Sequence, residues 1–211
     1  MTDRLRELTD ILESATDSGD YDLVIDMAKT IKGVPGLTCE IGVRAGGCSY
    51  KIMKTLLENE DQRPHVGLDP YGNIDYTHWE TTTQKLDYTN GMKLEMQKNL
   101  YAWCCETSYE FLFFPLEDTE FFKRYSDGIP IYNQVKIIVN QYSFVLFDGP
   151  HSSSIVRQEF DFFKDRMPSG GIMIFDDIYQ YPHMEILDPY MQECGFELIK
   201  TGSCKAAYRK K

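Results

Sequence analysis

Acidic residues follow two apolar segments in the second half of the chain. Asp148 comes directly after the apolar run 142–147, and the pair Asp176 and Asp177 follows the run 171–175. Carboxylates gathered in one place repel each other unless a positive charge lies among them. Oxygen ligands in an open site suit Mg²⁺ or Mn²⁺. The pattern predicts a divalent metal bound by Asp148, Asp176 and Asp177. The alternative is a helix cap at Asp177 and a turn acid at Asp148.

A histidine stands three residues after the first of these acids, in the segment Asp148-Gly149-Pro150-His151. A neutral imidazole has a pKa of about 6.5, which suits a general base at neutral pH. We therefore predict that His151 and Asp148 are catalytic. The alternative is that His151 has only a structural role.

A glycine-rich segment lies between a predicted strand and a predicted helix, and it has the spacing E-x-G-x-x-x-G-G over residues 40–47. Dinucleotide-binding turns instead have the spacing G-x-G-x-x-G. An acid just before the first glycine is poorly suited to pyrophosphate, whereas it suits an ammonium group. The predicted cofactor contacts in this segment are Glu40, Gly42, Val43, Arg44, Ala45, Gly46 and Ser49. An ordinary tight turn is the alternative.

The next predicted strand, residues 65–68, ends at Asp69. A carboxylate at that place can accept hydrogen bonds from both hydroxyls of a ribose. A nucleoside that carries an amino acid and a positive charge, but no phosphate, is S-adenosylmethionine (SAM). Glu40 and Asp69 together therefore predict a SAM site, with Asp148 at its edge.

Short apolar strands alternate with amphipathic helices along most of the chain. Helical spacing of apolar residues predicts helices over 3–16, 23–31, 49–57, 153–167 and 183–194, and strands are predicted over 37–41, 65–68, 111–114, 142–147, 171–175, 196–200 and 206–209. This order is typical of an α/β fold with a mostly parallel sheet covered by helices on both faces. Ligands of such sheets bind at the carboxyl ends of the strands, where the acids described above are expected.

These residues resemble the class I SAM-dependent methyltransferases over about residues 36–209, including the closing segment 195–208. The resemblance implies a Rossmann-like domain over residues 36–211, with strand order 3-2-1-4-5-7-6 and an antiparallel last strand. Residues 1–35 would be an N-terminal helical extension. Glu117 and Asp118 fall where the family contacts adenine, although a solvated acidic turn is an equal alternative.

The segment Asp148-Gly149-Pro150-His151 and the later acid pair resemble the metal-dependent O-methyltransferases, especially the branch that acts on sugars of natural products such as macrolides. Many relatives carry a second acid where this chain has Pro150. The resemblance implies metal-assisted methylation of a hydroxyl of a sugar, a deoxysugar or a glycan, and loss of activity in EDTA. A catechol or another phenol is the alternative acceptor.

The segment 70–108 is longer than a crossover helix requires, and it contains both tryptophans of the chain. Long insertions at an active edge are often lids or substrate walls, and a packed helix near residues 92–103 is the alternative. The predicted substrate contacts here and after the acid pair are Tyr71, Trp79, Tyr179, Tyr181 and His183.

The composition limits the partners. With 33 acidic and 22 basic residues the net charge is −11, which argues against binding to nucleic acid or to anionic lipid. No apolar run reaches the length of about 18 residues that a membrane span needs. The six scattered cysteines favour free thiols in a reducing cytoplasm over a zinc site or disulfides. We therefore expect a small-molecule or glycan acceptor as the partner.

Two questions stay open. The N-terminal helices could cover the site or form a contact between copies in a homo-oligomer. An NAD(P)-dependent oxidoreductase would need the glycine spacing that the chain lacks, and a non-catalytic binding domain on the same fold remains an alternative.

Overall fold

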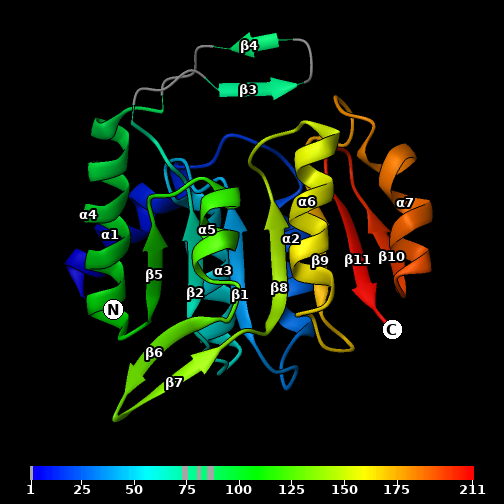
Figure 1. Cartoon of the computed structure of the whole chain (residues 1–211). Helices are drawn as coiled ribbons and strands as arrows, with labels where there is room; N and C mark the ends of the chain where they lie inside the picture. The colour runs from blue at the N-terminus through cyan, green and yellow to red at the C-terminus, as the bar shows by residue number, and fades with distance from the viewer. Residues whose placement is uncertain (1, 73–75, 80–81, 85–87) are drawn as a thin grey trace.

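A seven-stranded sheet forms the centre of the computed structural model, which describes residues 2–72, 76–79, 82–84 and 88–211, the two short inner ranges as backbone only (Figure 1). The strands of the sheet are β1 (Leu37–Ile41), β2 (His65–Leu68), β5 (Phe111–Phe114), β8 (Tyr142–Phe147), β9 (Ile172–Phe175), β10 (Phe196–Thr201) and β11 (Ala206–Lys210). All seven strands predicted from the sequence are present, with ends that differ by one residue at most.

The strand order across the sheet is β5-β2-β1-β8-β9-β11-β10. β11 runs antiparallel to both of its neighbours, β9 and β10, and the remaining pairs are parallel. When only the sheet strands are counted along the chain, this order is 3-2-1-4-5-7-6. The predicted topology is therefore confirmed, and the carboxyl ends of β1, β2, β8 and β9 share one edge.

Helices cover both faces of the sheet. On one face lie α1 (Asp3–Ser14), α2 (Tyr21–Thr30), α3 (Gly47–Glu58) and α4 (Asn90–Thr107), and on the other lie α5 (Asp118–Arg124), α6 (Ser153–Lys164) and α7 (His183–Glu193). Neighbouring residues of β8 enter opposite cores: Phe144 and Leu146 pack with α1–α4, whereas Val145 and Phe147 pack with α5–α7. A strand buried on both faces explains why its sequence is a continuous apolar run.

The N-terminal helices pack into the first of these cores. Leu12 of α1 and Val24 of α2 have no exposed surface. α1 contacts α3 and α4, and α2 contacts α3 and β9. The connection between α1 and α2 therefore crosses the first turn of α3, next to the glycine-rich segment.

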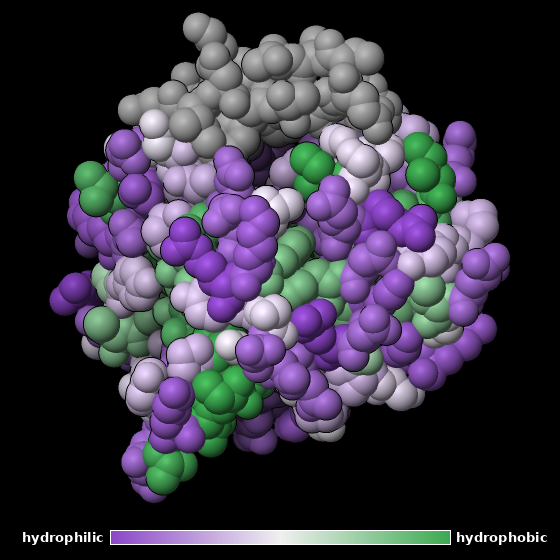
Figure 2. Space-filling view, viewed as in Figure 1, coloured by the Kyte–Doolittle hydropathy of each residue, from purple (hydrophilic) through white to green (hydrophobic). Residues whose placement is uncertain are grey.

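Two β-hairpins and the short helix α5 were not predicted. One hairpin, β3 (Tyr76–Trp79) with β4 (Thr82–Gln84), belongs to the insertion, and the other joins β6 (Ile129–Asn133) to β7 (Val135–Val139). The second hairpin projects from the domain, and exposed apolar side chains lie along it among polar ones (Figures 1 and 2). Tyr132 and Val135 there are 73% and 66% exposed.

Two further observations concern the whole described chain. Among the described residues, no helix combines the length and the apolar character that crossing a bilayer requires. All six cysteines are free thiols, and four of them are buried.

Candidate active site

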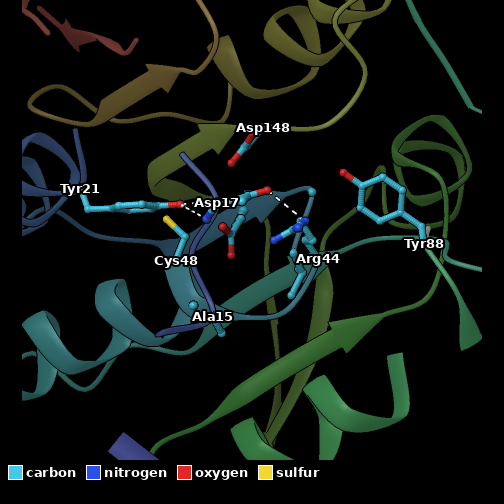
Figure 3. A pocket seen from close by; sticks show the side chains of 11 residues that line it. Ala15, Asp17, Tyr21, Arg44, Cys48, Tyr88 and Asp148 are labelled. Atoms are coloured by element: carbon cyan, nitrogen blue, oxygen red, sulfur yellow. Dashed lines mark hydrogen bonds and ion pairs between the residues drawn. The ribbon is translucent and has the colours of Figure 1, made fainter. Parts of the chain in front are cut away.

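Two adjoining pockets lie at the carboxyl edge of the sheet. The first, of about 320 Å³ including space open to solvent, is lined by Ala15, Asp17, Tyr21, Glu40, Gly42, Val43, Arg44, Gly47, Cys48, Tyr88 and Asp148 (Figure 3). The second, of about 760 Å³ including its open mouth, is lined by Asp17, Ser18, Gly19, Tyr88, Asp148, His151, Asp176, Asp177, Tyr179, Gln180, Tyr181 and Cys204. Asp17, Tyr88 and Asp148 line both, so the pockets share a boundary.

Glu40, at the end of β1, is a fully buried carboxylate that lines the first pocket. Its Oε2 accepts a short hydrogen bond from the Ser49 hydroxyl, which lies 3.1 Å from His65 Nε2. His65 Nδ1 in turn lies 2.9 Å from the Thr38 hydroxyl. Oε1 of Glu40 has no hydrogen-bond partner within the described part of the chain. Because a buried carboxylate oxygen without a partner is costly, this atom suits a cationic ligand.

Two glycines of the turn allow close contact between backbones. Gly42 has φ = 91°, and a Cβ there would lie 1.9 Å from the Asp148 carbonyl oxygen. A Cβ on Gly47 would lie 2.4 Å from the Ala15 carbonyl oxygen. The glycines therefore bring the turn against the end of β8 and against the segment after α1.

Asp69, at the end of β2, supports the same turn. Its carboxylate accepts hydrogen bonds from the backbone N–H of Arg44, at 2.9 Å, and of Tyr71, at 3.2 Å. Burial raises the pKa of Asp69 to about 6 despite these two donors. Tyr71 is itself buried, and its hydroxyl donates to the Arg44 carbonyl. Tyr71, which was predicted as a substrate contact, therefore packs against the glycine-rich turn and binds the Arg44 backbone.

The segment between α1 and α2 closes one side of the first pocket, a role that sequence analysis left open. Asp17 Oδ2 forms an ion pair with Arg44 Nε at 3.0 Å. The Tyr21 hydroxyl accepts from the backbone N–H of Asp17 and of Ser18, at 3.3 and 3.2 Å. In Figure 3 these residues face Tyr88, which comes from the insertion, across the pocket. The polar run over residues 17–20 was the only signal, and it indicates no more than a linker.

His151 lies in the second pocket, beside one of the predicted acids. Its Nε2 is 3.5 Å from Asp177 Oδ2. The ring stacks on Tyr181, with centroids 4.5 Å apart and planes at 8°, and the His183 ring is 5.8 Å away. Burial and the negative charge of Asp176 raise the pKa of Asp177 to about 6. The imidazole is therefore oriented by a ring on one side and by a carboxylate on the other.

The three predicted metal ligands do not form a cation site. Asp176 Oδ1 accepts from Lys205 Nζ at 2.7 Å and from the Asp177 N–H at 2.8 Å, and its Oδ2 accepts from the Ser18 hydroxyl at 3.1 Å. No group of three or more metal-ligating side chains occurs among the described residues. The donor set does not fit a divalent ion because an ammonium group already neutralises Asp176.

Asp148 remains close to this ion pair. Burial and the charge of Asp176 raise the pKa of Asp148 well above its usual value. Its carboxylate lines both pockets, whereas Lys205 has no exposed surface. Lys205 was not predicted, because it follows the turn after β10, far along the chain from the acids.

Several predicted site residues lie elsewhere. Glu117 is exposed, and the Asp118 carboxyl group turns inward to interact with Glu159, where burial raises the pKa of both acids. Ala45, Gly46 and Ser49 belong to the turn and the start of α3 but do not line the pockets. Tyr179 is 65% exposed at the mouth of the second pocket. The Trp79 side chain lies outside the described residues.

Comparison with known proteins gives matches to solved structures alone: no family model matches the chain, and no curated protein matches its sequence. The O-methyltransferase NovP is 17% identical, over 90% of this chain and 79% of that one, with a TM-score of 0.64. The chain has the class I methyltransferase fold. CalS11, a calicheamicin methyltransferase, is 14% identical over 99% of this chain and 91% of that one, with a TM-score of 0.61.

A third similar structure with this fold holds SAM. TomG from Streptomyces achromogenes, an O-methyltransferase involved in tomaymycin synthesis, is 11% identical. The match covers 100% of this chain and 91% of TomG, with a TM-score of 0.57. The apo form of CalS11 is described as a TDP-rhamnose 3'-O-methyltransferase, and it matches with a TM-score of 0.53 at 15% identity.

Proposed function

We propose that this protein is an enzyme that transfers a methyl group from SAM to a hydroxyl of a small-molecule acceptor. The observation that carries the proposal is Glu40, which lines the first pocket and whose buried Oε1 has no hydrogen-bond partner in the described chain. Burial of an ionised group without a counter-charge is costly, so this atom suits the ammonium of a ligand. The methionine part of SAM supplies such an ammonium.

A second acid, which lies behind the lining of the first pocket, supports the same ligand. Asp69 ends the strand next to β1, and its charge interacts with that of Glu40. Asp69 is 4% exposed and accepts from the N–H groups of Arg44 and Tyr71, so a ribose that enters beside Arg44 would use the remaining lone pairs of its carboxylate. Among the described residues that line the two pockets, Arg44 is the one lysine or arginine, which does not suit a pyrophosphate and argues against NAD(P). Adenine contact by Glu117 stays a prediction, whereas Asp118 faces Glu159.

SAM in the first pocket and an acceptor in the second would meet at the boundary that the two pockets share, and methyl transfer would take place there. An acceptor oxygen attacks the methyl carbon in line with the bond to sulfur, so an O–C bond forms as the S–C bond breaks. The sulfonium becomes a neutral thioether, and the hydroxyl proton passes to the His151 imidazole. Asp177, 3.5 Å from His151 Nε2, then balances the imidazolium charge. General-base help of this kind contributes roughly 10²–10⁴-fold to the rate.

We propose a sugar or glycan as the acceptor class, with a deoxysugar included. The second pocket is polar and carries flat rings at Tyr179 and Tyr181, which suit the apolar face of a sugar. CalS11, which has the same fold, is described as acting on TDP-rhamnose. A divalent ion would help to bind a catechol, and Lys205 already pairs with Asp176, one of the residues predicted to hold such an ion. Magnesium from the sequence prediction therefore has no step in this proposal.

A screen with SAM labelled at its methyl group tests this function. The acceptors are nucleotide-activated deoxysugars, free glycans and catechols, each with and without EDTA. We expect label on a sugar hydroxyl. Label on catechols alone would show that the acceptor class is a phenol and not a sugar. If the protein binds SAM but labels no hydroxyl, O-methylation is contradicted.

Two further expectations belong with this proposal. The six free thiols favour a reducing, cytoplasmic location. A homo-oligomer stays a prediction that sedimentation can test.

A further inference from the structure

A lysine is buried at the acidic edge of the sheet. The Lys205 side chain has no exposed surface, and its Nζ lies 2.7 Å from Asp176 Oδ1 and 2.5 Å from Ser18 Oγ. The ammonium also lies 5.1 Å from the centroid of the Tyr21 ring. A charged lysine without exposed surface is rare unless it is paired, and here each of these neighbours stabilises the charge.

The chain fixes this lysine through a contact between distant segments. Asp20, in the connection from α1 to α2, accepts from the backbone N–H of Cys204 at 2.6 Å and of Lys205 at 3.2 Å. The Ser203 hydroxyl donates to the same carboxylate at 3.0 Å. The α1–α2 connection therefore contributes two residues to this contact. Asp20 binds the β10–β11 turn, and Ser18 forms hydrogen bonds with both Lys205 and Asp176.

The position of the ammonium bears on metal binding. Divalent cations are bound through carboxylate oxygens with available lone pairs. At Asp176 both oxygens already accept hydrogen bonds, from Lys205, Asp177 and Ser18. A second cation beside Asp176 and Asp148 would also be repelled by the ammonium, which has no exposed surface through which to leave.

We propose that Lys205 is the resident cation of this acidic edge and acts there in place of a divalent metal. As a positioning residue, it pairs with Asp176 and holds that carboxylate in place, and its positive charge lies close to Asp148. The activation of the acceptor hydroxyl is then left to His151 and Asp177. The role given to His151 and Asp177 rests on the proposed methyl transfer. The role of Lys205 as the cation of the acidic edge can be tested without SAM or an acceptor.

The test is Mn²⁺ binding to the chain, measured by electron paramagnetic resonance. We expect no stoichiometric Mn²⁺ site at Asp176 in the wild-type protein. The substitution Asp176→Asn should therefore leave the Mn²⁺ binding of the chain unchanged. We expect that Lys205→Met binds one Mn²⁺ at least about tenfold more tightly than wild type, because three acids then lack a counter-charge. Lys200→Met is the matched control, since Lys200 is half-exposed and pairs with Asp26 at 2.9 Å, and it should bind as wild type does.

A stoichiometric Mn²⁺ site in the wild-type protein that Asp176→Asn abolishes would overturn the proposal. Equal Mn²⁺ binding by wild type and folded Lys205→Met would also overturn it. If Lys205→Met does not fold, Lys205→Arg keeps the charge, and it should remain without the site. None of these results depends on methyl transfer, so failure of the proposed function would be seen separately.

Discussion

Lys205 and Asp176 form a buried ion pair, 2.7 Å from Nζ to Oδ1, at the edge of the sheet where the sequence indicates a metal. Burial lowers the pKa of Lys205, but Asp176 and Asp148 outweigh this effect and raise it overall. Removal of one partner from a buried pair leaves an uncompensated charge and typically costs about 3–5 kcal/mol. The pair therefore links the closing hairpin to the catalytic edge.

Chelation is expected to leave methyl transfer intact. Because Lys205 neutralises Asp176, the enzyme should keep its rate in EDTA to within about twofold, and Mg²⁺ should not raise it. The measurement is initial rate with an acceptor found in the screen, after dialysis against chelator. A rate that collapses in EDTA and returns with Mg²⁺ would restore the metal implied by the sequence resemblance.

His151→Ala should separate catalysis from cofactor binding. The imidazole lies in the second pocket, apart from the residues that line the first. We expect kcat to fall by roughly 10²–10⁴-fold, as for loss of a general base, with little change in the Kd for SAM. Single-turnover kinetics and calorimetry measure the two quantities, and an unchanged kcat would remove His151 from the chemistry.

SAM affinity should depend on pH through Asp69. Its pKa is raised to about 6 by burial, so the carboxylate is charged above that pH and neutral below it. The charged form accepts two ribose hydroxyls better, so the Kd should rise as pH falls from 7.5 to 5. Asp69→Asn should bind more weakly at pH 7.5 and lose most of this pH dependence. A wild-type Kd that stays constant across the range would contradict the ribose role.

Asp20→Ala should destabilise the fold from a site that touches no ligand. The substitution leaves the N–H groups of Cys204 and Lys205 without their acceptor, which is worth about 1–3 kcal/mol. Asp20 has a lowered pKa, because its hydrogen bonds outweigh desolvation, so this stability is present above about pH 4 and is lost on acidification. Urea unfolding measures the change, with exposed Asp10→Ala as control. Equal stability of the two variants would show that the turn needs no anchor.

The sheet and its acidic edge could be predicted because the signals are local. The parallel strands are short and mostly apolar, and Asp69, Asp148 and Asp176 each follow one of them directly. The class I topology then brought these ends to one edge, as expected. The β6–β7 hairpin was missed because β7 is apolar in sequence although four of its five residues are exposed, and it directly precedes a β8 run of similar composition.

The partners of the acids could not be predicted because they come from distant segments. Lys205 reaches Asp176 only after β10 and β11 pair, and Ser18 reaches it only because α1 and α2 pack on α3. Likewise, nothing near Asp118 in the sequence indicates that Glu159, on the neighbouring helix, draws its carboxyl group inward. The position of an acid directly after a strand predicts that it lies at the carboxyl edge of the sheet. Which positive group pairs with it depends on contacts between distant segments.

Glu40 provides the most direct test of the SAM site. Its Oε1, which has no partner in the described part of the chain, should bind the ammonium of SAM, so Glu40→Gln should bind SAM roughly 10–100-fold more weakly, in line with about 1.5–3 kcal/mol for a hydrogen bond to a charged group. Glu58→Gln, on the exposed end of α3, is the control.

The decisive measurement is calorimetric titration of the wild-type chain with SAM and, separately, with NAD. The account predicts one SAM bound per chain, weakened by Glu40→Gln and not by Glu58→Gln, and no heat with NAD. Absence of SAM binding to folded protein, or equal affinity in the Glu40→Gln variant, would contradict it.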